Sequence, residues 1–398
     1  MSKRPEDDDD GLYDHPDDDE DEDLEDESSN DPDDEDEPEE EIEDVEIVPL
    51  SGDLQATARD LSHQEARFLV TDFYLMQECR IRAGNQIESL KGKVANPILR
   101  HFFKQFKCLE GQMRGTLKIF ADHDEMGIWA QSIRGIGEVL SSGLIAHIDM
   151  MKAPTVGAIW RFGGYDPSLK WLSRKKSNQE VAAVLSELTT LKGLEKLEEA
   201  MRILVKRYGF KLETIRYNAT HSFNGKPKKL TRDSLCASLC RRPYNERLHT
   251  LLWKIGESFV KFQNKPDDIY GKLFVARKAF ENERNERGEL ADQAAKKLRD
   301  FDISTSKKAY AIYAKGQLPP GHIHARAKRW TVKLFLSHWH HVAHWETFGR
   351  APIKPYPLVR IPGHTHEIPV PNFNPLKYRD YPIKPYPVAG LRSSPSPE

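Results

Sequence analysis

Apolar residues recur at intervals of three and four along most of the chain between Leu61 and Thr347, which is the spacing of amphipathic helices. From Leu61 to Asp122 the pattern predicts two long helices, with Asn96 as the N-cap of the second and Pro97 at its first helical position. Further helices are predicted over residues 181–208, 232–241, 246–263, 269–301 and 323–347. The polar stretch 218–229 is expected to be a loop. The fold class is therefore expected to be mainly α, a helical bundle.

The two ends of the chain lack this pattern. Residues 1–50 are mostly Asp and Glu, so they are expected to form a disordered acidic tail. Residues 351–398 are rich in proline and contain Ile-Lys-Pro-Tyr-Pro twice, which favours an extended, polyproline-like tail. The expected regions are the acidic tail (1–50), a helical hairpin (51–124), a helix-hairpin-helix region (125–210), a basic helical region (211–350) and the proline-rich tail (351–398).

The charge of the chain is divided unevenly between the acidic tail and the rest. The formal net charge is −4, but residues 1–50 hold 28 of the 63 acidic residues and 2 of the 59 basic ones. Residues 51–398 therefore hold 57 basic against 35 acidic residues, an excess of 22 positive charges. An excess of this size favours a polyanionic partner such as nucleic acid over mere solvation of helix faces.

One short segment has the pattern of a phosphate-binding turn. A helix is predicted to end at Arg134, Gly135-Ile136-Gly137 to form a tight turn, and a new helix to begin at Glu138. Glycine permits a positive φ and lets a phosphate approach amide groups that a Cβ would shield. The free amides at the start of the second helix would face the anion, and Arg134 would add a positive charge. We therefore expect contacts to the DNA backbone, with little dependence on base sequence. The residues expected to form them are Arg134, Gly135, Ile136 and Gly137.

Three further basic groups are expected to contribute to DNA binding. Their residues are Arg174, Lys175 and Lys176; Arg241 and Arg242; and Arg326, Lys328 and Arg329. The third group lies on a helix that also carries Trp and His rings, which would pack or stack at the margin of a basic face. RNA remains an alternative ligand to DNA.

Two blocks of the chain resemble one known family. They comprise Ser-Ile-Arg-Gly-Ile-Gly (132–137), the helix up to Asp149, Ile-Trp-Arg-Phe-Gly-Gly-Tyr-Asp-Pro (159–167), Gly225-Lys226, Arg-Arg-Pro-Tyr-Asn-Glu-Arg-Leu (241–248) and the helix 251–256. Together they are similar to the C-terminal domain of Piv-like (DEDD) insertion-sequence transposases and site-specific recombinases. The resemblance covers residues 128–297 and implies a role with DNA, in transposition or recombination.

The catalytic half of that family has no counterpart in this chain. The family begins with an RNase H-like (RuvC-type) domain whose carboxylates hold divalent metal at strand ends, and no strand-rich sequence of that kind precedes Gly135. The resemblance also implies a serine nucleophile, for which Ser222 is the nearest candidate. We expect no cofactor, and Mg²⁺ only if a nuclease activity exists.

Eight of the 15 histidines lie between His322 and His366. His340 and His344 are four residues apart on a predicted helix, as two zinc ligands on one face would be, and His338 and His341 are three apart. No cysteine lies nearby and no acidic residue completes a zinc motif, so no metal is expected. The rings are expected either to pack or stack at the margin of the basic face or to pack in the core, two interpretations of comparable weight.

Four scattered cysteines and the absence of a signal peptide or long apolar run lead us to expect a cytoplasmic, nucleoid-associated protein without membrane contact. The acidic tail is expected to increase solubility or to occupy the protein's own basic surface, with contact to a basic partner as the alternative, and a homo-oligomer is compatible with the sequence. The first functional hypothesis is a non-enzymatic DNA-binding protein. The alternatives are a divergent transposase or recombinase that uses Ser222 or a partner's metal site, and a protein-binding scaffold.

Overall fold

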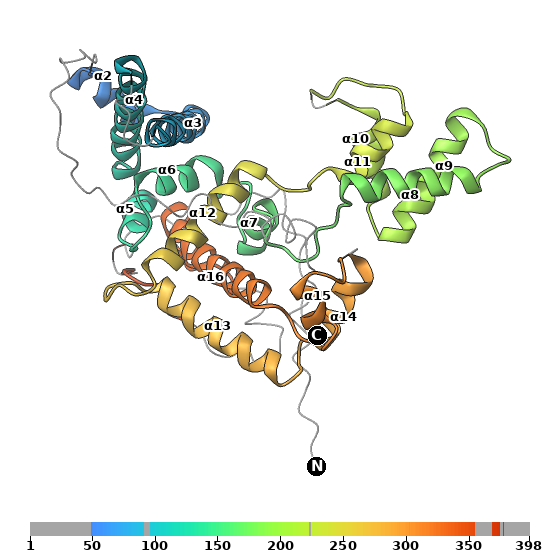
Figure 1. The fold of residues 1–398 in the computed structure, drawn as a ribbon. Coiled ribbons are helices and arrows are strands. Elements are labelled where there is room, and N and C mark those ends of the chain that lie inside the picture. Colours follow the sequence, from blue (N-terminus) through green and yellow to red (C-terminus); the bar gives the residue numbers. More distant parts are fainter. Residues whose placement is uncertain are drawn as a thin grey trace. The chain divides into compact units, whose positions relative to one another are not determined.

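The computed structural model describes residues 49–90, 96–222, 224–301, 303–354, 368–374 and 377. Within these residues the structure is mainly helical, as the sequence predicts, and the one extended pairing is an isolated bridge between His221 and Pro227 (Figure 1). The acidic tail up to residue 48 and most of the proline-rich tail lie outside the described residues.

The described chain forms two compact units. Unit 1 comprises residues 161–246, and unit 2 comprises the described residues before and after it. The boundary predicted between residues 210 and 211 falls inside unit 1. The amide of Asn245 donates a hydrogen bond to the carbonyl of Phe162 at 2.8 Å, so the two ends of unit 1 are joined to each other.

Unit 2 contains most of the helices. They are α2 (Gly52–Ala56), the 3-10 helix η2 (Thr57–Asp60), α3 (His63–Glu88), α4 (Pro97–Asp122), α5 (Glu125–Gln131), α6 (Glu138–His147), α7 (Val156–Phe162), α12 (Glu246–Phe262), α13 (Tyr270–Glu286), α14 (Ala291–Asp300), α15 (Lys308–Tyr313) and α16 (Pro320–Phe348). The boundaries with unit 1 fall within α7 and at the first residue of α12.

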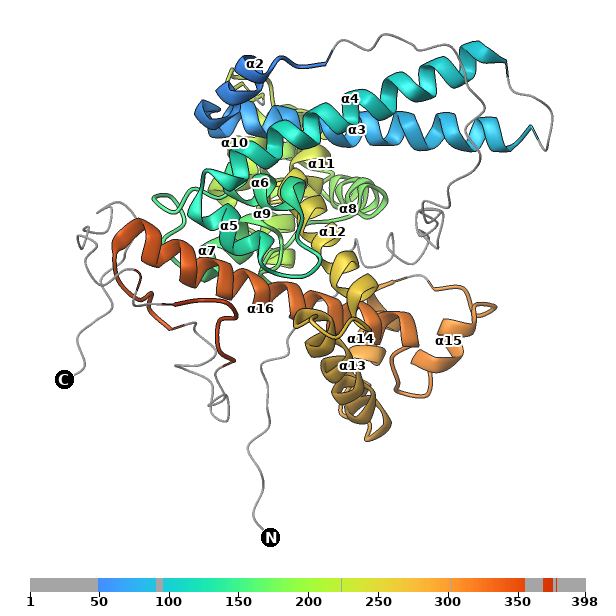
Figure 2. The ribbon, with the colours of Figure 1, turned by 90° about the vertical axis from the view of Figure 1, so that its left-hand side faces the viewer.

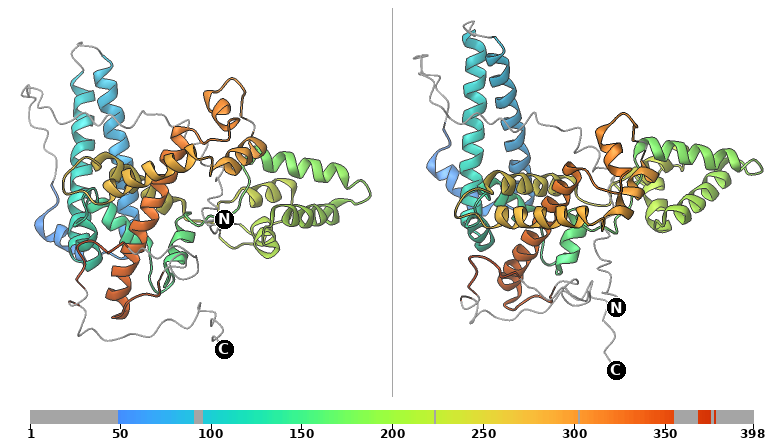
Figure 3. Two further views of the ribbon diagram at one scale, coloured as in Figure 1. Left: turned by 90° about the horizontal axis from the view of Figure 1, so that it is seen from below. Right: turned by 60° about the horizontal axis from the view of Figure 1, so that its bottom comes forward.

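Helices α3 and α4 form a long antiparallel pair (Figures 2 and 3). Ser62 and Glu65 form a capping box at the start of α3, and the Asn96 side chain accepts a hydrogen bond from the amide of Ile98, with Pro97 next to it. The predicted N-cap and first helical position are thus confirmed. These caps hold amides that would otherwise have no partner, so both helices begin where the sequence indicates.

One predicted helix is divided in two by a glycine. Residues 269–301 form α13 and α14, and Gly288 between them has a φ of +75°, a conformation that a helix does not permit. The carboxylate of Glu289 then receives hydrogen bonds from Arg284 at 2.9 Å and Arg287 at 2.6 Å. The high charge of this segment therefore stabilises a turn instead of lining one long solvated helix.

An aromatic cluster forms the centre of unit 2. Tyr270 of α13 stacks on Phe259 of α12 with ring centroids 4.8 Å apart, and it meets the edge of Phe335 of α16 at 5.3 Å. Trp129 of α5 stacks on the same Phe335 at 6.0 Å. Because Trp129 lies in the last turn before residues 132–137, this cluster fixes the position from which the turn leaves the core.

Unit 1 is built on four helices, α8 (Arg174–Glu187), α9 (Gly193–Tyr208), α10 (Leu212–Thr220) and α11 (Arg232–Cys240). Val181, Met201, Leu204 and Leu235 are fully buried at its centre. The hydroxyl of Ser177 donates to the carbonyl of Cys236 at 3.0 Å, which ties α8 to α11. Unit 1 thus has its own hydrophobic core.

The prediction that Arg326 binds DNA is wrong, because Arg326 belongs to the core of unit 2. Its side chain is 2% exposed, it lies 3.3 Å from a carboxylate oxygen of Glu281, and it donates to the side chain of Gln293 at 2.6 Å. Glu281 is 1% exposed and also pairs with Arg277 and Arg284. A charged group that is buried this deeply is held by its ion pairs and is not accessible to a polyanion.

We predict that Arg326→Ala lowers the free energy of unfolding by about 3 kcal/mol, because it leaves Glu281 buried with less positive charge around it. Arg82→Ala is the control: Arg82 pairs with Glu78 at 2.7 Å on the exposed surface of α3, where an ion pair contributes about 0.5 kcal/mol or less. Denaturant unfolding of both variants measures the difference. Equal midpoints for the two variants would contradict the buried role of Arg326.

Candidate nucleic-acid interface

The segment Ser132–Gly137 turns the chain between α5 and α6. The amide of Ile136 donates to the carbonyl of Ile133 at 3.0 Å, which closes the turn. Gly135 has a φ of +92°, so the positive φ predicted for this turn is confirmed at that residue. Gly137, the N-cap of α6, has a φ of −90° and a ψ of −177°, which any residue can adopt.

The side chains of Ile133 and Ile136 fasten the turn to the core. They are 2% and 4% exposed, respectively. The prediction that Ile136 contacts DNA is not supported by its surroundings, because its side chain is buried and its amide already donates to the Ile133 carbonyl. The apolar positions of the turn therefore anchor it, while Arg134 between them is at the surface.

Gly135 packs closely against α12. A Cβ added to it would lie 2.8 Å from the hydroxyl oxygen of Ser258 and 3.1 Å from the ring of Phe262. The Ser258 hydroxyl donates a hydrogen bond to the Gly135 carbonyl at 2.6 Å. Gly135 thus has a structural reason to be glycine in addition to its positive φ.

Gly137 has no such contact. Nothing lies within 4 Å of the position that its Cβ would occupy, and no side chain caps the amides at the start of α6. The N-terminus of a helix carries a partial positive charge from these amides. The carboxylate of Glu138, at the first position of α6, lies 3.6 Å from the side chain of Arg114 and reduces this charge locally.

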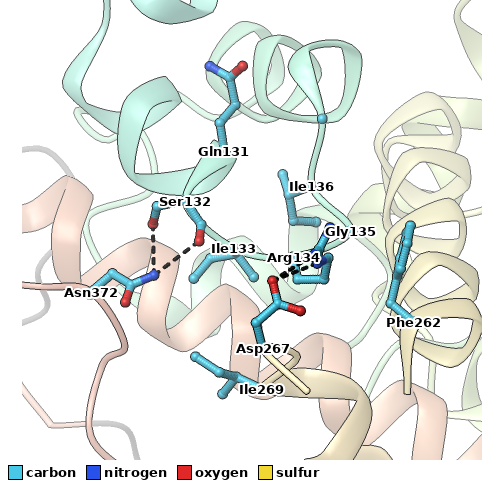
Figure 4. Close-up of a pocket in the computed structure, with 11 residues that line it drawn as sticks. Gln131, Ser132, Ile133, Arg134, Gly135, Ile136, Phe262, Asp267, Ile269 and Asn372 are labelled. Carbon is cyan, nitrogen blue, oxygen red and sulfur yellow. Dashed lines mark hydrogen bonds and ion pairs between the residues drawn. The ribbon is translucent and has the colours of Figure 1, made fainter. Parts of the chain in front are cut away.

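The turn borders a surface groove with a volume of about 700 Å³ (Figure 4). The groove is lined by Gln131, Ser132, Ile133, Arg134, Gly135, Ile136, Gly137, Phe262, Asp267, Ile269 and Asn372. All of these residues belong to unit 2. Both glycines and the arginine that the sequence singled out therefore lie together at one accessible site.

Arg134 is held by a carboxylate across the groove. Its Nε and Nη2 atoms donate to Oδ2 of Asp267 at 2.9 and 2.5 Å, and its guanidinium lies 5.9 Å from the centre of the Phe262 ring (Figure 4). The two charged side chains are 45% and 56% exposed. The hydrogen bond from Arg134 lowers the pKa of the Asp267 carboxyl, so this group stays ionised and neutralises Arg134.

The segment Ile368–Asn374 crosses the other side of the turn. The Asn372 side chain donates to the carbonyl and hydroxyl oxygens of Ser132 at 3.0 and 3.1 Å (Figure 4). The indole of Trp129 donates to the carbonyl of Pro371 at 2.9 Å. Sequence reasoning missed Asn372, Asp267 and Phe262, since nothing in their local patterns connects them with a turn more than a hundred residues away.

The other side chains of unit 2 that were predicted to bind DNA are partly or fully buried. Lys328 is half-buried, pairs with Glu257 and lies 5.1 Å from the centre of the Trp253 ring. Arg329 is half-buried on the same helix. With Arg326 in the core, the three residues do not form the open basic face that was predicted.

The predicted cations of unit 1 are more accessible. Arg174 and Lys175 are exposed in the first turn of α8, and Lys176 lies 5.6 Å from the centre of the Tyr208 ring. Arg241 is exposed and donates to the side chain of Asn218 at 2.8 Å. These residues lie in a different unit from the turn, and Arg242, which is half-buried, pairs with Glu246 at 3.8 Å.

Ser222, the candidate nucleophile, helps to form a loop. Its hydroxyl oxygen accepts a hydrogen bond from the amide of Lys226 at 3.1 Å, and its own amide donates to the Lys226 carbonyl at 2.8 Å. The neighbouring His221 ring uses Nδ1 toward the Tyr217 carbonyl and the Thr220 hydroxyl. Ser222 thus has a structural function in this loop, and the described hydrogen bonds do not couple it to a base.

Three histidines of α16 contact backbone carbonyls. Nε2 of His340 lies 3.0 Å from the Pro154 oxygen, and Nδ1 of His344 lies 2.8 Å from the Arg350 oxygen. His338 contacts the Tyr270 hydroxyl at 2.7 Å and the Ile368 carbonyl at 3.0 Å. Within the described part of the chain, no three His, Cys, Asp or Glu side chains gather as metal ligands would.

Comparisons of the chain with protein-family models, curated proteins and solved structures found no match. The resemblance to insertion-sequence transposases therefore stays a prediction. None of the described helices combines the length and the apolar character that a membrane crossing requires.

We predict that His340 makes the stability of the protein dependent on pH. Burial lowers its pKa to about 4, below the value of about 6.5 for an unfolded chain. As the pH falls from 6.5 to 4, the unfolded chain takes up a proton that the folded protein does not. His340 therefore costs up to about 3 kcal/mol of stability over this interval.

His340→Gln retains an amide donor for the Pro154 carbonyl and removes this titration. Denaturant unfolding at a series of pH values should show a shallower loss of stability in the variant than in the parent. His147, whose pKa burial also lowers to about 4, is present in both proteins and does not contribute to the difference. Parallel pH profiles would exclude His340 as the titrating group.

Proposed function

We propose that the protein binds duplex DNA through its phosphate backbone at the Ser132–Gly137 turn, with little dependence on base sequence. The observation that carries this proposal is that some residues of the turn are buried while others are accessible. Ile133 and Ile136 are buried, whereas the backbone at Gly137 and the guanidinium of Arg134 border an accessible groove. A backbone amide at a helix N-terminus next to an arginine is a recurrent way to bind phosphate.

The charge of the chain supports the same ligand. Residues 51–398 carry an excess of 22 positive charges, enough to attract a polyanion over a long range. The order α5, glycine turn, α6 is also the order of elements in a helix-hairpin-helix motif. In this proposal it is the part shared with mobile-element transposases, without their RuvC-type nuclease domain.

The Arg134–Asp267 ion pair affects how strongly Arg134 can bind a phosphate. Asp267 already occupies two of the five donors of the Arg134 guanidinium. To use these two donors a phosphate must displace the carboxylate, and the exchange is feasible because both side chains are about half exposed. Asp267 thus acts as an internal competitor of the ligand.

Binding of a labelled duplex across a salt series tests the proposal. We expect the logarithm of the affinity to fall linearly with the logarithm of the salt concentration. Gly137→Ala should weaken binding severalfold without changing the unfolding midpoint, because its Cβ meets only the space that a phosphate would enter. Gly135→Ala is unsuitable, since it disturbs the contact with α12.

The measurement needs the full chain and a chain that begins at Pro49. Residues 1–48 carry the acidic side chains that would compete with DNA for the basic surface. If the shortened chain does not bind duplex DNA even at low salt, the proposed function is wrong.

The ion pair yields a second prediction, in which its two partners have opposite effects. Arg134→Ala should weaken duplex binding about tenfold at low salt and reduce the salt slope by about 0.9, the value for one phosphate contact. Asp267→Asn should strengthen binding severalfold, because it frees Arg134 and removes a negative charge from the groove. The matched controls are Arg82→Ala and Glu78→Gln, which change the same charges in an exposed pair on α3. If each control shifts the affinity as much as its counterpart, only the net charge matters and the groove has no special role.

A further inference from the structure

Unit 1 carries a second concentration of positive charge, apart from the turn of unit 2. Residues 161–246 contain 18 Lys and Arg against 9 Asp and Glu, an excess of 9 in 86 residues. The helices that surround the core of this unit need no such charge for their packing, since the buried positions are apolar. Part of this excess lies on the loop between α10 and α11, which projects from the helices (Figure 1).

The described residues of this loop are held in a hairpin-like conformation. The amide of Lys228 donates to the Thr220 carbonyl at 2.7 Å, and Ser222 and Lys226 exchange hydrogen bonds. Gly225 has a φ of +73° and its amide donates to the Ser222 carbonyl at 3.0 Å, so the chain reverses there. The loop is therefore ordered by its own backbone, without using the side chains of its lysines.

Lys226, Lys228 and Lys229 are all exposed. Within the described part of unit 1, no carboxylate or carbonyl group binds their ammonium groups. Asp233, in the first turn of α11, is the nearest acidic residue along the sequence and is also exposed without an ion pair. Among the described residues these three lysines thus have no carboxylate partner, unlike Arg134, which pairs with Asp267.

An aromatic pair with an exposed tyrosine lies next to the reversal of this loop. The ring of Tyr217 stacks on the ring of His221 with centroids 4.2 Å apart and planes inclined by 12°. Tyr217 is nevertheless 53% exposed. A Cβ on Gly225 would lie 3.8 Å from the Tyr217 hydroxyl, so the reversal of the loop is next to this ring. Arg241 binds Asn218, the residue after Tyr217, and adds a further charge to the same end of α10.

An aromatic ring with an open face among free cations fits one type of ligand especially well. A base can stack on the ring while neighbouring phosphates meet the lysines, and this combination is typical of proteins that bind single strands. The bases of a duplex are already stacked on one another, so a duplex has no free base face to offer. In a site that binds backbone phosphate alone Tyr217 could contribute only its hydroxyl, whereas a single strand also uses the face of its ring.

We propose that Tyr217, together with Lys226, Lys228 and Lys229, forms a binding site for single-stranded nucleic acid. A base stacks on the exposed face of Tyr217, which His221 supports from the other side, and the lysines bind the adjacent phosphates. This site does not depend on the turn of unit 2 and takes a different form of nucleic acid.

The test compares three labelled ligands of one sequence with the full-length protein: single-stranded DNA, single-stranded RNA and duplex DNA. Tyr217→Leu should weaken binding of a single strand about tenfold, while duplex binding changes less than twofold. Tyr217→Phe retains the stacking face and should bind like the parent. Replacing Lys226, Lys228 and Lys229 by Gln should reduce the single-strand salt slope by about 2.

The matched control replaces Lys192, Lys206 and Lys211 by Gln, three exposed lysines of the same unit that lie outside the loop. This control should change the slope much less than the loop variant. The proposal is overturned if the parent binds neither single strand, if Tyr217→Leu and Tyr217→Phe behave alike, or if the two lysine triples have the same effect. Single-strand binding without duplex binding would retain this site and reject the function proposed for the turn.

Discussion

The candidate interface of unit 2 depends on the packing of Gly135 against α12. A turn can offer its backbone to a ligand only if other contacts hold it, because its own amides cannot be both structural and free. Ser258 binds the Gly135 carbonyl and leaves no room for a Cβ, while Ile133 and Ile136 enter the core on either side of Arg134. These contacts leave the backbone at Gly137 unobstructed at the start of α6. The two glycines of the turn therefore have different functions, one for packing and one for access.

Fewer basic side chains are available to bind a polyanion than the excess of positive charge implies. Arg326 belongs to a buried network of ion pairs with Glu281. Lys328 pairs with Glu257, and Arg134 pairs with Asp267. Only the last of these pairs is open enough to solvent to exchange its carboxylate for a phosphate. By contrast, the lysines of the α10–α11 loop have no ion-pair partner among the residues that the structure describes. Electrostatic attraction is therefore general, but the cations that can form direct contacts are those without a buried or paired side chain, and such cations lie in both units.

Much of the fold followed from local patterns. The helix pair α3 and α4, its Asn96 cap and the positive φ of Gly135 were all predictable, because each depends on residues near in sequence. The burial of Arg326 was not predictable, since an arginine on an amphipathic helix looks the same whether it faces solvent or a glutamate from another helix. Asp267 and Asn372 were missed for the same reason, as they reach the turn from distant segments. His340 and His344 had the spacing of zinc ligands, but their nitrogens meet backbone carbonyls that no sequence pattern reveals.

Unit 1 has its own core, and a hydrogen bond between Phe162 and Asn245 joins its ends. A unit closed in this way places few constraints on the chain that enters and leaves it, so its surface can acquire a function separate from that of unit 2. The two proposed sites require different features of nucleic acid, an intact backbone at the turn and an unstacked base at Tyr217.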